Sequence, residues 1–195
     1  MIRRIPQTLL AVVALCGTAV SSEAQDPEAY CRDALARARV LSPSTRGPSD
    51  DVYRLGSCGR GGYQVVGELF VRARGSHDTG FLHQLLSFVS GGDGLLLLDP
   101  LLTVAEDRQA TAEARVTAMV GLIQLQSGVN AITFHDLSVG IENTTCGVGR
   151  MVTDQGGHPK TTAADAARVV AVAKRIRADP TAPMEVRTGA MCLGG

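Results

Sequence analysis

The chain contains no tryptophan and few other aromatic residues, with three tyrosines and four phenylalanines among 195 positions. Aromatic side chains form the surfaces on which the bases of single-stranded nucleic acids stack. Their scarcity argues against such a binding track and against a carbohydrate-stacking platform. Net charge is absent too, because 19 basic residues balance 19 acidic ones. A neutral chain exerts no long-range attraction on nucleic acid or anionic lipid, so we expect neither as a partner.

The familiar spacings of catalytic and metal sites are also missing. No Cys-x-x-Cys or His-x-x-x-His pair occurs, although structural zinc sites use such spacings. The glycine-rich stretches 59–62 and 147–149 have no preceding strand, which a phosphate loop requires, so both are expected to be turns. We therefore predict no catalytic residues, no cofactor and no metal. The alternative is a small exported hydrolase or metal-dependent enzyme assembled from His135, Asp136 and Cys146, with the thiol as nucleophile.

Residues 1–24 have the three-part pattern of a secretory signal peptide. Two arginines precede a largely apolar stretch at 8–20, and the small residues Ser22 and Ala24 predict cleavage after Ala24. A membrane-spanning helix needs about 20 apolar residues, and this stretch is shorter, so we expect no stable insertion after cleavage. We predict a periplasmic or secreted protein. Seventeen arginines against two lysines favour a bacterial source with a GC-rich genome.

Four cysteines remain once Cys16 leaves with the signal peptide: Cys31, Cys58, Cys146 and Cys192. An even number of cysteines in an oxidising compartment predicts two disulfides. Three pairings are possible, and the sequence alone does not choose among them. If helices stack in chain order, neighbouring cysteines meet, which favours Cys31–Cys58 and Cys146–Cys192.

Residues 25–195 are long enough for a single domain with its own core, and helical patterns dominate them. Asp26 with Pro27 predicts one helix start, Asp78 a second, and the pair Thr162 and Asp165 resembles a capping box. The clearest amphipathic pattern lies at 111–126. Residues 129–160 are glycine-rich and irregular, and form either an insertion or a degenerate repeat. The expected helices lie at 27–40, 49–56, 63–74, 78–90, from 93 onward, 111–126, 162–178 and 182–193.

Two segments, 107–119 and 179–191, align without gaps at an offset of 72 residues. In each segment an Asp precedes a helix that carries an acidic residue, an arginine and a small alanine. Alanine at such a position lets neighbouring helices approach closely. The repeated motif residues are Glu113, Arg115 and Ala118 in the first segment and Glu185, Arg187 and Ala190 in the second.

These motifs resemble HEAT and HEAT-like repeats, whose second helix often reads acidic, then Val-Arg, then alanine. Met184 to Ala190 fits that pattern well, and Glu113 to Ala118 fits it loosely. The resemblance implies an all-α fold, a short α-solenoid of helical hairpins, with an irregular helical bundle as the alternative. It also implies a concave surface for a protein or peptide partner rather than a reaction.

The sequence therefore predicts an exported helical-repeat protein that acts as a protein-binding or scaffolding module. The hydrolase described above is the enzymatic alternative, and a purely structural component of the cell envelope is a third.

Overall fold

The computed structural model describes residues 26–42, 49–127 and 160–193, and every regular element within these ranges is a helix. The prediction of an all-α chain is confirmed for this part of the molecule. The elements are, in order, α1 (Pro27–Val40), α2 (Asp50–Arg54), η1 (Leu55–Cys58), α3 (Gly59–Arg72), η2 (Ala73–Gly75), α4 (Thr79–Leu86), η3 (Ser87–Ser90), η4 (Gly94–Leu97), α5 (Leu98–Glu106), α6 (Ala112–Ser127), α8 (Ala163–Ala178) and α9 (Met184–Cys192), where η marks a 3-10 helix.

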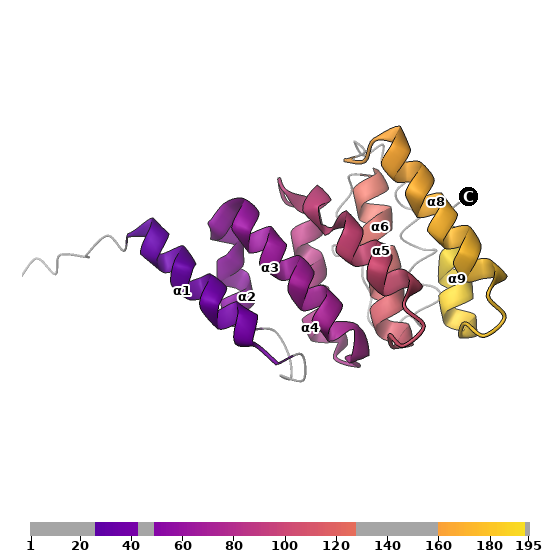
Figure 1. The fold of residues 1–195 in the computed structure, drawn as a ribbon, viewed down its shortest axis with the longest axis horizontal. Coiled ribbons are helices and arrows are strands. Elements are labelled where there is room, and N and C mark those ends of the chain that lie inside the picture. Colours follow the sequence, from indigo (N-terminus) through magenta and orange to yellow (C-terminus); the bar gives the residue numbers. More distant parts are fainter. Residues whose placement is uncertain (1–25, 43–48, 128–159, 194–195) are drawn as a thin grey trace, which may run out of the picture.

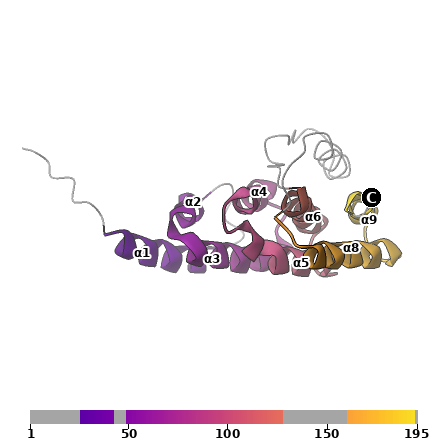
Figure 2. The same cartoon turned by 90° about the horizontal axis from the view of Figure 1, so that it is seen from above.

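The α-helices form two rows, and the chain alternates between them (Figures 1 and 2). Helices α1, α3, α5 and α8 lie side by side in the first row, and α2, α4, α6 and α9 form the second. Each helix contacts the next helix of its own row and its partner in the other row. The two segments related by the 72-residue offset each span a turn and run into the following second-row helix, α6 or α9. They belong to adjacent pairs, because α8 contacts α5 and α9 contacts α6.

Short polar side chains begin several of these helices as the sequence predicts. The Asp26 carboxylate accepts the backbone N–H of Glu28 at 3.1 Å, and Pro27 occupies the first helical position. Asp78 accepts the N–H of Phe81 at 3.0 Å. Each contact satisfies a backbone donor that the first helical turn leaves free.

The predicted capping box at the start of α8 is also present. The Thr162 hydroxyl accepts the backbone N–H of Asp165 at 3.2 Å, and the Asp165 carboxylate accepts the N–H of Thr162 at 3.1 Å. Asp stands here in place of the usual Glu, and its shorter side chain still reaches the backbone N–H of the capping residue. The Thr162 hydroxyl also donates to the Asp165 carboxylate at 2.8 Å. This hydrogen bond and the one from the Thr162 backbone N–H lower the pKa of Asp165, with a smaller contribution from Arg168, against a small opposing effect of burial.

The structure corrects three local predictions. The glycine-rich stretch 59–62 is the start of α3 rather than a turn. Gly62 is required there because a Cβ atom at this position would lie 2.0 Å from the carbonyl oxygen of Leu55. The uninterrupted apolar run Leu95 to Leu98 predicts burial of all four side chains, yet Leu95 is 39% exposed.

Helix α6 is the third correction, because it is not amphipathic. Every residue from Ala114 to Leu125 is buried, including the polar Thr117 and Gln124. The helix lies between α4 and α9 in the second row and also packs against α5. A helix surrounded in this way buries its whole circumference rather than one stripe.

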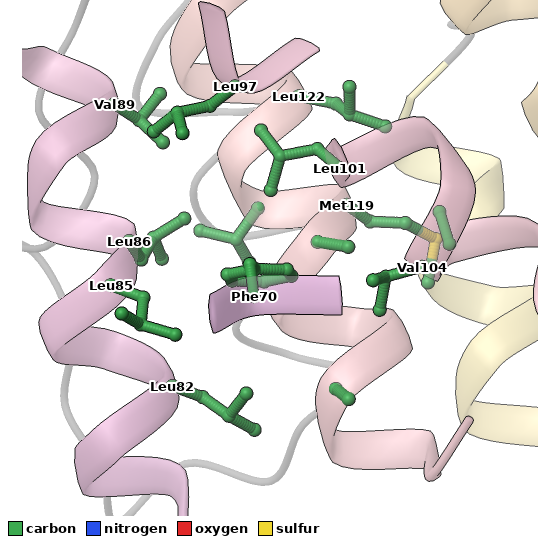
Figure 3. Packing of buried hydrophobic residues seen from close by; sticks show 14 of the residues in the cluster. Phe70, Leu82, Leu85, Leu86, Val89, Leu97, Leu101, Val104, Met119 and Leu122 are labelled. Carbon is green, nitrogen blue, oxygen red and sulfur yellow. The ribbon is translucent and has the colours of Figure 1, made fainter. Parts of the chain in front are cut away.

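The hydrophobic core lies between the two rows (Figure 3). Phe70 from α3 lies close to leucines of α4, and Met119 of α6 lies near Val104 of α5. Gly121 allows α6 to come this close, since a Cβ atom there would lie 2.8 Å from the Leu86 side chain and 2.9 Å from that of Leu101. The core thus ties successive pairs into one continuous array.

Candidate functional site

A groove of about 540 Å³ runs along the surface between the first-row helices α5 and α8. Leu102 and Val172 are buried and form its apolar floor, and Thr103 is exposed beside them. Asp99 and Glu106 of α5 lie seven positions apart, so both fall on the same face of that helix. The remaining lining residues are Ala171 and the arginines Arg168 and Arg175 of α8.

Two ion pairs cross this groove. The Arg168 guanidinium pairs with Asp99, and the Arg175 guanidinium pairs with Glu106. The hydrogen bond and the charge of Asp99 raise the pKa of Arg168, and Glu106 raises the pKa of Arg175 in the same way. The groove therefore carries charges of both signs above an apolar floor.

In the first copy of the repeated motif, Glu113 and Arg115 lie in the first turns of α6. Arg115 is only 3% exposed, and its Nε donates to the carbonyl oxygen of Ala105 at 3.0 Å. Glu113 Oε1 lies 3.1 Å from Nδ1 of His77. Burial acts to raise the pKa of the Glu113 carboxyl, but hydrogen bonds from His77, its own backbone and Thr111, with the charge of His77, lower it overall.

The second copy of the motif keeps the alanine position and changes the arginine contact. Ala190 is fully buried like Ala118. Glu185 lies in the first turn of α9, as Glu113 does in α6. The Nε of Arg187, however, is buried without a hydrogen-bond partner in the described part of the chain. The repeat is therefore equivalent in its helix packing but not in the contacts of its arginine.

Cys31 and Cys58 form a disulfide with their Cα atoms 5.3 Å apart, within the usual range. This confirms the predicted first pairing and ties α1 to the end of η1. Cys146 lies outside the described residues, and the side chain of Cys192 at the end of α9 is likewise not described. The second pairing stays a prediction.

The enzymatic alternative involves residues outside the described part of the chain. His135, Asp136 and Cys146 all fall in 128–159. Across 26–42, 49–127 and 160–193, no group of three His, Cys, Asp or Glu side chains is placed to hold a metal ion. His77 is exposed and contacts Glu113.

The groove was not predicted from the sequence, although a signal for it exists. Asp99 and Glu106 are seven residues apart, and so are Arg168 and Arg175. Opposite charges at the same helical spacing on two helices indicate that the helices lie side by side. That signal becomes readable only once 99–106 and 168–175 are known to be neighbours.

Comparison with known proteins identifies no relative, because no family model, curated protein or solved structure matches this chain. None of the helices in the described ranges is both long and apolar enough to cross a membrane.

Proposed function

We propose that this chain is an exported helical-repeat protein, a short α-solenoid of HEAT-like hairpins, that binds a protein or peptide partner in the groove between α5 and α8. The solenoid assignment is supported by the alternation of the chain between two rows and by the adjacency of the two repeat copies. In such arrays each pair buries its apolar face against its neighbours and leaves inter-pair grooves open.

The single observation that carries the binding proposal is the pair of ion pairs across the groove. Exposed ion pairs contribute little stability, about 0–1 kcal/mol, so a partner's charges can replace them at low cost. The side chain of Arg168 is 52% exposed and that of Arg175 is 61% exposed, so a partner in the groove can contact both guanidinium groups. The buried Leu102 and Val172 below them then provide apolar contact for the partner's side chains.

The spacing of the charges defines the partner. Positions seven apart on a helix are separated by about 10 Å along its axis. An extended chain rises about 3.3 Å per residue, so charged side chains roughly three residues apart on an extended segment would reach both ends of the groove. We expect a partner segment with acidic and basic residues at that spacing.

A photo-crosslinking amino acid placed at Thr103 tests this proposal. Thr103 is exposed in the groove, whereas Gln64 is exposed on α3 away from it and provides the matched control. Crosslinking in intact cells that export the protein should give a discrete adduct from position 103 and none from position 64. The same adduct should disappear in the Arg168→Glu/Arg175→Glu double variant, whose melting temperature should stay close to wild type. Equal adducts at 103 and 64, or an adduct that survives charge reversal, would reject the groove as the binding site.

Export has its own test. Cleavage after Ala24 predicts a mature chain that begins at Gln25. Intact-mass measurement of the protein recovered from the periplasm or medium gives the new N-terminus directly. A chain recovered in the cytoplasm with residues 1–24 attached would contradict the proposal.

A further inference from the structure

A smaller pocket of about 160 Å³ opens where the α5–α8 groove reaches the loops that join the two rows. Glu106 and Arg175 line both the groove and this pocket, so the two are continuous. The full lining consists of Glu106, Arg108, Arg115, Arg175, Ile176 and Asp179. Three arginines and two carboxylates thus surround a space large enough for a few non-hydrogen atoms.

Arg115 is the unusual member of this set. Although it is 97% buried, it forms no ion pair with any described residue, and its single hydrogen bond uses Nε to reach Ala105. Its two Nη atoms donate to no described group, yet they are not among the buried polar atoms sealed from solvent. The guanidinium therefore presents its paired N–H groups to the pocket.

The other charges in the pocket are already paired. Arg108 Nε lies 2.9 Å from Oδ2 of Asp179, and Arg175 pairs with Glu106. Two of the three arginines are neutralised in this way, and the lining keeps a net charge of one positive unit on Arg115. A buried charge without a paired counter-ion is costly to desolvate. Burial lowers the pKa of Arg115, and the charge of Arg108 lowers it slightly further, partly offset by the charges of Asp179 and Asp107.

We propose that this pocket binds a carboxylate as a monoanion, with the Arg115 Nη groups donating to its two oxygens. A planar guanidinium matches a planar carboxylate in a two-hydrogen-bond arrangement. A dianion is disfavoured because Glu106 and Asp179 line the same small space. The carboxylate belongs either to a free small molecule or to a polypeptide in the groove. The polypeptide source rests on the proposed function, whereas the anion site does not.

The test follows the ¹⁵Nε–¹Hε resonance of Arg115 in the intact mature protein during titration with sodium acetate, against sodium chloride at matched ionic strength. Acetate should shift this resonance to saturation, and chloride should leave it nearly unchanged. The Arg108→Gln variant releases Asp179 to pair with Arg115, and it should weaken acetate binding at least about tenfold, since one charge-assisted hydrogen bond is worth that factor. Arg32→Gln removes the same charge from an exposed site on α1 and should leave the titration unchanged.

A second titration distinguishes the two sources of carboxylate. Acetyl-trialanine with a free C-terminus is compared with its C-terminal amide and with acetate. Tighter binding of the free peptide than of acetate assigns the site to a polypeptide, and equal binding assigns it to small carboxylates. An Arg115 resonance that does not respond to acetate, or that responds equally in Arg108→Gln, overturns the anion site while leaving the crosslinking result at Thr103 untouched.

Discussion

Asp107 and Asp179 occupy the same position in successive helix pairs, at the end of α5 and of α8 respectively. Each carboxylate accepts a backbone N–H two residues further on, from Gln109 at 2.8 Å and from Thr181 at 3.0 Å. Each also pairs with an arginine from the loop of the preceding helix pair. Arg74 lies 3.1 Å from Asp107, and Arg108 lies 2.9 Å from Asp179. The aspartate therefore shapes its own loop and connects it to the neighbouring one.

This arrangement predicts that the folding stability contributed by Asp179 decreases at acidic pH. Hydrogen bonds from the Thr181 side chain and backbone lower the pKa of Asp179, and the charges of Arg108 and Arg115 lower it further, against a small opposing effect of burial. The stabilisation by Asp179 is therefore complete above the ordinary Asp pKa, about 3.9, and is lost as pH falls through the lower folded value. Asp179→Asn should lower the melting temperature at pH 7, and the difference from wild type should shrink steadily below pH 4.

The control for that experiment is Asp93→Asn, which removes an exposed carboxylate outside the repeat loops. Its melting temperature should follow the wild-type curve across the same pH range. A constant difference between Asp179→Asn and wild type from pH 7 to pH 2 would show that the carboxylate charge contributes nothing through its shifted pKa.

Local signals in the sequence were sufficient for much of the fold. Helix starts at Asp26, Asp78 and Thr162 were predicted because a cap depends on residues within one turn. The 72-residue repeat was visible because adjacent pairs reuse the same loop aspartate and the same small alanine, Ala118 or Ala190. The first disulfide followed from stacking in chain order. Each of these depends on short-range pattern or on neighbouring elements.

The errors and omissions all concern contacts that no local pattern encodes. The stripe at 111–126 predicted one buried face, but packing on several sides buries α6 around its circumference. The stretch containing Gly62 was predicted to be a turn, because the sequence does not show how close the Leu55 carbonyl lies to this glycine. The groove charges and the role of Lys160 depend on residues about 70 positions apart. Such pairs are brought together only by the stacking of the array.

Lys160 provides a second prediction. Its ammonium donates to three consecutive backbone carbonyls at the end of η3, those of Val89, Ser90 and Gly91, at 3.1, 2.7 and 2.6 Å. Lys160→Met keeps the apolar stem and leaves these acceptors without their charged donor. Because hydrogen bonds to charged groups are worth about 1.5–3 kcal/mol, we expect a loss of roughly 2 kcal/mol in the free energy of unfolding, measured by urea denaturation.

Lys174 is the matched control, since it is the other lysine of the chain and lies exposed on α8. Lys174→Met should change the free energy of unfolding by less than about 0.5 kcal/mol. Equal effects of the two substitutions would contradict the capping role of Lys160.

The Cys31–Cys58 bridge gives a third prediction. It closes a loop over a sequence separation of 27 residues, and such a bridge stabilises by about 2–4 kcal/mol. The Cys31→Ser/Cys58→Ser variant should lose that amount in denaturant unfolding. Wild type in excess reductant should lose at least as much, and any further loss that reductant causes in the variant reports a second disulfide. Alkylation of Cys31 and Cys58 in unfolded, non-reduced protein would contradict the bridge.

Neighbouring glycines in the first turn of α3 give the sharpest stability test. A Cβ atom on Gly62 would lie 2.0 Å from the backbone oxygen of Leu55, whereas one on Gly61 would make an ordinary 3.7 Å contact with the Leu35 side chain. Gly62→Ala must displace backbone and should cost about 1–3 kcal/mol or more, the range for overpacked sites. Gly61→Ala removes a flexible helical glycine and should stabilise by up to about 1 kcal/mol. Urea denaturation of both variants should therefore give shifts of opposite sign, and shifts of the same sign would reject the close approach of η1 to α3.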